Sequence, residues 1–124
     1  MKTRFLNLEL EICRKLLKDY MTKKEFFDFV GADNQRMLEL LQKKNNDYTA
    51  GADNALANFE QAERIGIDPV KGILLRVLDK IKRFETFAKH GFLSVENETV
   101  LDTADDIEGY MKAIKAYLKN RNYP

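Results

Sequence analysis

Residues 68–91 read DPVKGILLRVLDKIKRFETFAKHG and carry the clearest structural signal in the chain. Asp68 stands before a proline, which is the arrangement of a helix N-cap followed by proline at the first helical position. Apolar residues then recur every three or four positions, within an arc of about 140° at about 100° per residue. The pattern predicts a helix that begins at Pro69, ends near Gly91 and turns one apolar face toward a core. The residues of that face are Ile73, Leu74, Val77, Leu78, Ile81 and Phe84.

The segments before this helix show similar spacing, and little interrupts it, because the chain of 124 residues contains only two prolines and six glycines. This composition favours helices. Residues 1–12 alternate partly like a strand, although residues 6–19 also support a helix, and we favour the helix. Helices are further expected over residues 22–30, starting with a Thr22–Glu25 capping box and stopped by Gly31, over residues 34–44 and over residues 53–64, with a loop at residues 45–51.

A last long helix is expected to reach Asn120, capped by Ser94 or Asn97. It is acidic early and basic late, which complements the helix dipole. Its predicted buried seam consists of Val100, Ala104, Ile107, Met111, Ile114 and Leu118. The chain is therefore predicted to be a single all-α domain, a helical bundle of about five to six helices. Residues 1–33 are expected to form an N-terminal helical extension, and residues 34–120 the core.

The composition excludes several classes of protein. Lys and Arg number 21 against 20 Asp and Glu, so the formal net charge is +1, without the basic excess that binding to duplex nucleic acid usually needs. No apolar run approaches the roughly 20 residues of a membrane span, and no signal-peptide pattern is present. We therefore expect no membrane association and a cytoplasmic location. A single cysteine, Cys13, and a single histidine, His90, exclude an internal disulfide and an ordinary zinc cluster.

Charged residues gather on two predicted helix faces of opposite sign. The basic face consists of Arg76, Asp79, Lys80 and Arg83, and the acidic face of Glu98, Asp102, Asp105 and Asp106. Carboxylates three or four residues apart have Cβ atoms about 5 to 6 Å apart, close enough to hold Mg2+ together. Arginine and lysine supply donors for phosphate oxygens. Together the two faces suit a metal-bound nucleoside phosphate; alternatively, each face is only a solvated helix surface.

A second polar cluster, which also contains aromatic residues, lies within residues 43–60. Tyr48 or Phe59 can stack on a base while neighbouring Asn and Lys side chains bond to its edge or to phosphate. The alternative is a helix stop, a turn and a new cap, because Asn and Asp are ordinary turn residues. Glu60 and Glu63 are either part of a metal site or solvent-facing helix charges.

These pieces together resemble a known family. They are Lys44-Asn45-Asn46-Asp47-Tyr48, then Asn58-Phe59, then Arg76-x-x-Asp79-Lys80-x-x-Arg83, then Glu98-x-x-x-Asp102-x-x-Asp105-Asp106 with Tyr110. Over roughly residues 38 to 118 the chain is similar to the small all-helical nucleotide modification associated domain found mainly in bacteriophages. That family stands near the MazG-like and dUTPase-like all-alpha nucleotide pyrophosphohydrolases, whose helices supply E-x-x-E and E-x-x-D sets of Mg2+ ligands. By this resemblance Glu60 and Glu63 correspond to the E-x-x-E set, and Asp102 and Asp105 to the E-x-x-D set, with Asp102 in place of its glutamate.

The resemblance implies a phage-type protein that binds a nucleoside phosphate and processes it with Mg2+, as a pyrophosphohydrolase does, in the cytosol of the host cell. The implied catalytic residues are Asp102, Asp105 and Lys80, and the implied metal ligands are Glu60, Glu63, Asp102, Asp105 and Asp106. The candidate ligand-binding residues are Lys44, Asp47, Tyr48, Asn58, Phe59, Arg76, Asp79, Lys80 and Arg83. Two alternatives stay open, namely a non-catalytic protein that captures a cyclic or modified signalling nucleotide, and a structural oligomerisation module.

We also expect a homo-oligomer, most simply a twofold dimer. The aspartate face of the last helix is predicted to lie opposite its apolar seam, so that the aspartates point away from the core. Small-molecule sites are normally concave, and a second copy can supply the missing wall. Tyr110, Tyr117 and residues 5–12 are candidates for the contact, and ordinary core packing is their alternative role.

Overall fold

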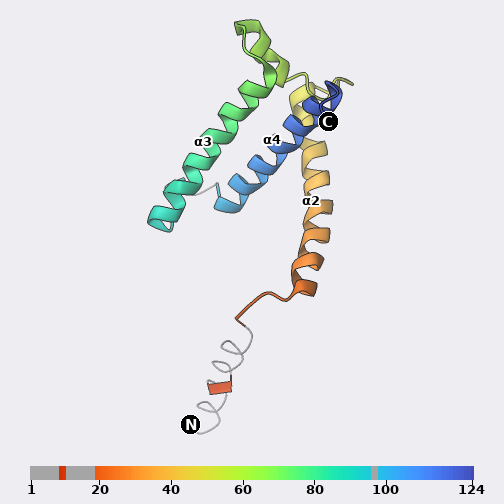
Figure 1. Ribbon diagram of the computed structural model, residues 1–124. Coiled ribbons are helices and arrows are strands. Elements are labelled where there is room, and N and C mark those ends of the chain that lie inside the picture. The colour runs from red at the N-terminus through yellow and green to blue at the C-terminus, as the bar shows by residue number, and fades with distance from the viewer. Residues whose placement is uncertain (1–8, 11–18, 96–97) are drawn as a thin grey trace. The chain divides into compact units, whose positions relative to one another are not determined.

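The computed structural model describes residues 9–10, 19–95 and 98–124 (Figure 1). Its elements are the α-helices α2 (Lys23–Thr49), α3 (Pro69–His90) and α4 (Val100–Asn120) and the 3-10 helix η1 (Phe59–Ile65). The described residues contain no strand, which confirms the all-α class, although their helices are fewer than the five to six expected. The helix expected over residues 6–19 and the cap expected at Asn97 lie outside the described residues, apart from residues 9, 10 and 19.

The chain divides into two compact units, Met1–Leu38 and Glu39–Pro124. None of the helices in the described part of the chain is both long enough and apolar enough to cross a membrane. The second unit holds α3, α4, η1 and the last turns of α2, and it also holds all of the candidate site residues.

Helix α2 replaces two predicted helices and most of the predicted loop at residues 45–51. Its N-terminus is capped as predicted, because the Glu25 backbone N–H donates to Thr22 Oγ1 at 3.1 Å. Gly31 does not end it, since a helix stop of that kind needs a left-handed residue and Gly31 is not among the residues with positive φ. A glycine inside a helix costs only about 1 kcal/mol. The helix ends instead at Ala50 and Gly51, where φ is 52° and 76°.

The segment predicted as a helix over residues 53–64 forms turns followed by η1, which begins at Phe59. The predicted stop is correct, because Gly66 closes η1 in the left-handed conformation. The Leu56 backbone N–H donates to Asn54 Oδ1 at 3.2 Å, so the Asn54 side chain holds a turn rather than starting a helix.

Helix α3 forms where the sequence predicts it. Asp68 Oδ2 accepts from the Val70 backbone N–H at 3.1 Å, and the Gly91 backbone N–H donates to the Phe87 carbonyl at 2.7 Å. With φ at 79°, Gly91 adopts the left-handed conformation that glycine enters at little cost. Helix α3 packs beside α4 (Figure 1). The core of this contact consists of Ile73, Ala113, Ile114 and Tyr117, with Leu56, Phe59, Val70, Tyr110 and Leu118 packed against it.

Only half of the predicted apolar face of α3 is shielded from solvent. Ile73 and Val77 are buried and Phe84 is half-buried. The other half is exposed, with Leu74 at 47%, Leu78 at 53% and Ile81 at 39% of their full accessible surface. The prediction that all six residues face inward is therefore wrong for three of them, because within the described residues α4 and η1 cover one side of α3 and leave the adjacent side open.

Helix α4 is rotated about its axis relative to the sequence prediction. Its buried residues are Thr103, Ala113, Ile114 and Tyr117, so Ile114 alone of the predicted seam is fully buried. The Tyr117 hydroxyl donates to the Leu56 carbonyl at 3.2 Å, which satisfies its polar end inside the core. The helix starts at Thr99, not at Ser94, through a capping box in which Thr99 and Asp102 bond to each other's backbone N–H. This rotation brings the side of α4 that carries Asp106 toward the other helices.

Candidate functional site

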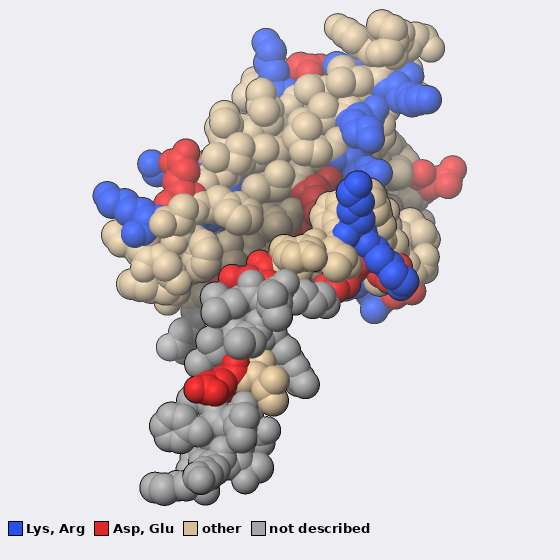
Figure 2. Space-filling model, turned by 60° about the horizontal axis from the view of Figure 1, so that its bottom comes forward, with Lys and Arg blue, Asp and Glu red and all other residues tan. Residues whose placement is uncertain are grey.

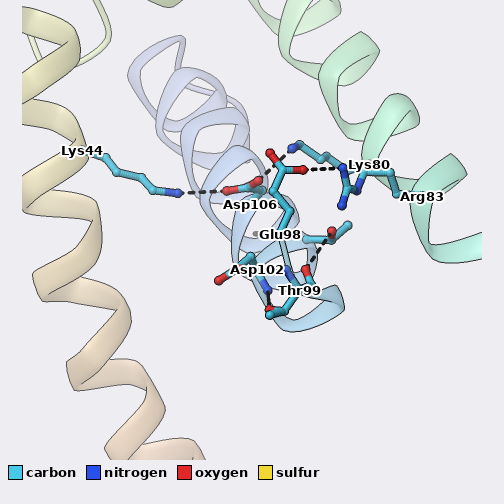
Figure 3. A network of polar contacts seen from close by, with 8 residues as sticks. Lys44, Lys80, Arg83, Glu98, Thr99, Asp102 and Asp106 are labelled. Atoms are coloured by element: carbon cyan, nitrogen blue, oxygen red, sulfur yellow. Dashed lines mark hydrogen bonds and ion pairs between the residues drawn. The ribbon is translucent and has the colours of Figure 1, made fainter. Parts of the chain in front are cut away.

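Asp106 of α4 lies between two lysines from two other helices. Its Oδ1 is 2.9 Å from Lys44 Nζ on α2, and its Oδ2 is 2.9 Å from Lys80 Nζ on α3 (Figure 3). Both lysines were predicted to bind ligand and Asp106 to bind metal, and the fold brings the three together. The expectation that the aspartates point away from the core is wrong for Asp106, whose side chain is only 23% exposed.

The charges of this group reinforce one another. Burial by itself raises the pKa of Asp106, but the hydrogen bonds from Lys80 and Lys44 more than offset it and hold that pKa below its ordinary value. Burial by itself lowers the pKa of Lys44, and the hydrogen bond to Asp106 reverses this, so the pKa of Lys44 is raised. The carboxylate and the ammonium are therefore both ionised at neutral pH.

The reach of Lys44 to Asp106 depends on a close approach of the two helices. Leu41, one turn before Lys44, places its Cδ2 only 3.1 Å from the point where a Cβ on Gly109 would lie. Since Gly109 has no Cβ, the Leu41 side chain packs directly on α4. The glycine one turn after the aspartates thus permits the geometry of the site.

A second ion pair lies beside the first. Arg83 Nη1 on α3 donates to Glu98, just before α4 (Figure 3). The Nε and Nη2 atoms of Arg83 are buried and have no hydrogen-bond partner among the residues that the structure describes. Arg83 does not line the pocket described below, and its contact with the site is the ion pair with Glu98.

Asp102 has a structural role at the start of α4. Its Oδ2 accepts from the Thr99 backbone N–H at 3.0 Å, while its own backbone N–H donates to Thr99 Oγ1 at 3.1 Å. The bonds from the Thr99 backbone and side chain lower the pKa of Asp102. One carboxylate oxygen is thereby engaged, and the other is available.

A pocket of about 230 Å³ lies among these charged groups. Its lining residues are Leu40, Lys44, Lys80, Glu98, Thr103, Asp102, Asp105 and Asp106. Drug-sized ligands occupy sites of roughly 300 to 1,000 Å³, so this pocket accommodates a phosphate or diphosphate group rather than a whole nucleotide. Four carboxylates against two ammonium groups make the lining acidic.

The five predicted metal ligands do not form one cluster. Asp102, Asp105 and Asp106 line the pocket, whereas Glu60 and Glu63 lie on η1. Glu60 accepts from Asn54 Nδ2 at 3.2 Å, and both glutamates act electrostatically on Tyr117, about 22 Å along α4 from Asp102 at 1.5 Å per residue. Within the described ranges, no group of three or more His, Cys, Asp or Glu side chains is arranged to hold a metal ion.

Other predicted ligand-binding residues lie outside the pocket lining. The guanidinium of Arg76 lies over the Phe59 ring, 5.5 Å from its centroid, and Phe59 meets Tyr110 edge-on at 6.4 Å. These contacts belong to the edge of the core. Asp79 is exposed and Asn58 is half-buried before η1. Asp47 and Tyr48 lie in the last turn of α2, and Tyr48 is 65% exposed.

Sequence reasoning missed three residues of the site, in different ways. Leu40 and Thr103 were given no role in a site, yet both line the pocket. Thr99 was overlooked as the cap, although the spacing Thr99-x-x-Asp102 has the form of a capping box with Asp in place of Glu.

The wider surface carries both signs of charge. Figure 2 shows basic and acidic side chains interspersed with each other and with wide uncharged areas on the face drawn, as expected for a formal net charge of +1. Attraction of a charged ligand therefore depends on the local groups of the pocket rather than on a general field.

Comparisons of the chain with protein families, with curated proteins and with solved structures give no match.

Proposed function

We propose that the protein binds the phosphate groups of a nucleotide, together with Mg2+, in the pocket around Asp106. The observation that carries the proposal is the pair of ammonium groups, Lys44 and Lys80, that Asp106 holds at the edge of a phosphate-sized pocket. An ammonium group has three donors, and each lysine uses one on Asp106. The remaining donors are available to phosphate oxygens, and Asp106 positions the two lysines.

Mg2+ enters the proposal through the charge of the lining. Four carboxylates outweigh two ammonium groups, so a phosphate without a cation meets net repulsion. A cluster of three or more ligands is not required, because Mg2+ is usually bound by one or two carboxylates together with phosphates and water. The free oxygen of Asp102 and the carboxylate of Asp105 are the candidates for this role. When bound, Mg2+ would neutralise and polarise the phosphate oxygens.

The proposal assigns different roles to the residues around the pocket. Lys44 and Lys80 contact phosphate, and Arg83 holds Glu98 at the pocket through the ion pair between them. The base and sugar extend outside the pocket, which is too small to enclose them. Glu60 and Glu63 have no part in this site.

We place binding ahead of hydrolysis because carboxylates of the pocket already have structural partners. Asp106 is held by both lysines, Asp102 caps α4 and Glu98 pairs with Arg83. Asp105 lines the pocket as well, and this favours Mg2+-dependent hydrolysis of a nucleoside phosphate, with Asp105 as the base, as the second candidate.

The experiment is isothermal titration calorimetry with a panel of nucleoside mono-, di- and triphosphates, each with and without Mg2+, in parallel with an assay for released phosphate and pyrophosphate. The proposal predicts heat of binding that requires both a phosphate chain and Mg2+. Product release that follows binding would establish the second candidate. Absence of binding for the whole panel would refute both.

A further inference from the structure

A row of exposed residues on α3 lies beside the side that packs on α4. Lys71, Leu74, Leu78, Ile81 and Glu85 follow one another at intervals of three, four, three and four residues. At about 100° per residue they fall within an arc of about 80°. All five are exposed, and the three apolar members include Leu78 at 53%. We call this row the outer seam.

The outer seam has the form of a helix-pairing surface. Alternating intervals of three and four residues are the spacing at which two helices interlock side chains along a common line. Three large apolar side chains in one row on a rigid helix also exceed the single exposed apolar residues that need no explanation. Among the described residues, the helices that pack on α3 cover the adjacent side, which carries the buried residues Ile73 and Val77.

The charges at the two ends of the seam are arranged symmetrically. Lys71 lies seven residues before Leu78 and Glu85 lies seven residues after it. In an antiparallel pair of identical helices, residues at equal distances from the twofold axis face each other. With the axis at Leu78, Lys71 of each copy therefore faces Glu85 of the other. In the same register Leu75, which is 61% exposed, lies at the level of Ile81 of the other copy, and Leu74 at the level of Lys82.

We propose that two copies of this chain pair through the outer seam of α3, antiparallel, with the twofold axis at Leu78. The charge pattern selects this occupant. A parallel pairing would set Lys71 against Lys71 and Glu85 against Glu85, which costs free energy. The ion pair that Glu85 makes with Lys82 within one chain is 3.5 Å long and highly exposed, so it competes weakly.

This contact differs from the dimer expected from the sequence. Tyr117 is buried in the core and is not available to a second copy, while Tyr110 is half-buried and packs against that core. The seam from Lys71 to Glu85 is about 21 Å long at 1.5 Å per residue. Such a contact is smaller than a standard interface of about 800 Å² per partner, so the dimer is expected to dissociate on dilution. The proposal does not depend on nucleotide binding, because Lys80 points to α4 instead.

Sedimentation velocity of the full-length chain, from about 1 to about 500 µM, tests the pairing. Lys71→Glu and Glu85→Lys each place like charges at both ends of the seam, and we expect each to weaken the dimer about tenfold. An equimolar mixture of the two variants restores both ion pairs in the heterodimer and should recover the wild-type affinity. Leu78→Asp should abolish the dimer, whereas the matched control Leu101→Asp, at a leucine of α4 that is 74% exposed, should not.

A second measurement tests the register. In a Cys13→Ser background, which removes the only native cysteine, Leu78→Cys should form a disulfide-linked dimer on mild oxidation, and Leu101→Cys should not. Circular dichroism checks that each variant keeps its helices. A monomer at every concentration would overturn the proposal. The outer seam would then be a surface for the chain's own first unit or for another partner. A dimer that ignores the charge changes and does not cross-link at position 78 would overturn it equally.

Discussion

Asp106 on α4 and Lys80 on α3 form an ion pair of 2.9 Å in which each side chain keeps about a quarter of its exposed surface. An exposed pair of this kind contributes at most about 1 kcal/mol, whereas removal of one partner from a buried pair costs about 3 to 5 kcal/mol. The contribution of this partly buried pair to stability is therefore expected to lie between these two values. The pair also joins two helices, α3 and α4, that supply residues to the pocket lining.

Replacing Lys80 by alanine should weaken nucleotide binding. The change removes a charge-assisted contact to phosphate, worth about 1 to 3 kcal/mol, and it also leaves Asp106 with Lys44 alone. Calorimetry with the best ligand of the panel measures the effect. Lys82→Ala is the matched control, because Lys82 is on the same helix and highly exposed. Equal affinities of the two variants would remove Lys80 from the proposed site.

Asp106→Asn should lower the free energy of unfolding by about 1 to 3 kcal/mol, because two partly buried ammonium groups lose their counter-charge at almost constant volume. Urea denaturation at pH 7 provides the measurement. The control is Asp28→Asn, which removes the exposed partner of Lys24 on α2 and should change stability by less than about 0.5 kcal/mol. A loss at Asp28 as large as that at Asp106 would contradict the role assigned to the central aspartate.

The stabilisation by Asp106 should disappear in acid. Its pKa is lower in the folded protein than its ordinary value of 3.8, so the unfolded chain binds the proton more readily. The contribution is complete above the ordinary pKa and is lost as pH falls through the lower, folded value. The stability difference between wild type and Asp106→Asn, measured by urea denaturation from pH 7 down to the acid limit of folding, should therefore shrink on acidification. A difference that stays constant with pH would argue against an ionic origin.

The same group should lose stability at high pH for the opposite reason. The pKa of Lys44 is raised in the folded protein above its ordinary value of 10.5, so its contribution is complete below that value and is lost as pH rises through the folded pKa. We expect Lys44→Met to be less stable than wild type at pH 7 and to approach it at strongly alkaline pH. Lys43→Met, at an exposed neighbour, serves as the control. A gap between wild type and Lys44→Met that does not narrow at alkaline pH would contradict the pairing with Asp106.

Two glycines inside helices should respond differently to alanine. Gly31 has nothing within 4 Å of a built Cβ, so Gly31→Ala should stabilise the protein by up to about 1 kcal/mol through helix propensity alone. At Gly109 the same Cβ would meet Leu41 Cδ2 at 3.1 Å. Gly109→Ala should therefore gain less or lose stability, and Gly109→Val should also weaken nucleotide binding by displacing α2 and Lys44. Thermal unfolding and calorimetry provide the two measurements, and equal gains at both glycines would show that the close approach is unimportant.

The amino-acid sequence determined the local features of this protein. Asp68, Pro69 and Gly91 set the ends of α3, because capping depends on atoms within one turn of the helix end. The three- and four-residue spacing likewise established the all-α class. The sequence did not show that α2 continues through Gly31. A glycine ends a helix only when the chain after it turns away from the helix axis, and the residue type alone does not decide this.

The tertiary structure alone decided which side of each helix is buried. A helix period defines an apolar face, but its boundary depends on what packs against it, and so Leu78 is exposed while Val77 is buried. In the same way, the rotation of α4 turned Asp106 toward lysines that lie far away in the sequence, one of them 62 residues distant. Such a contact arises from the packing of separate helices, which no local pattern of residues encodes.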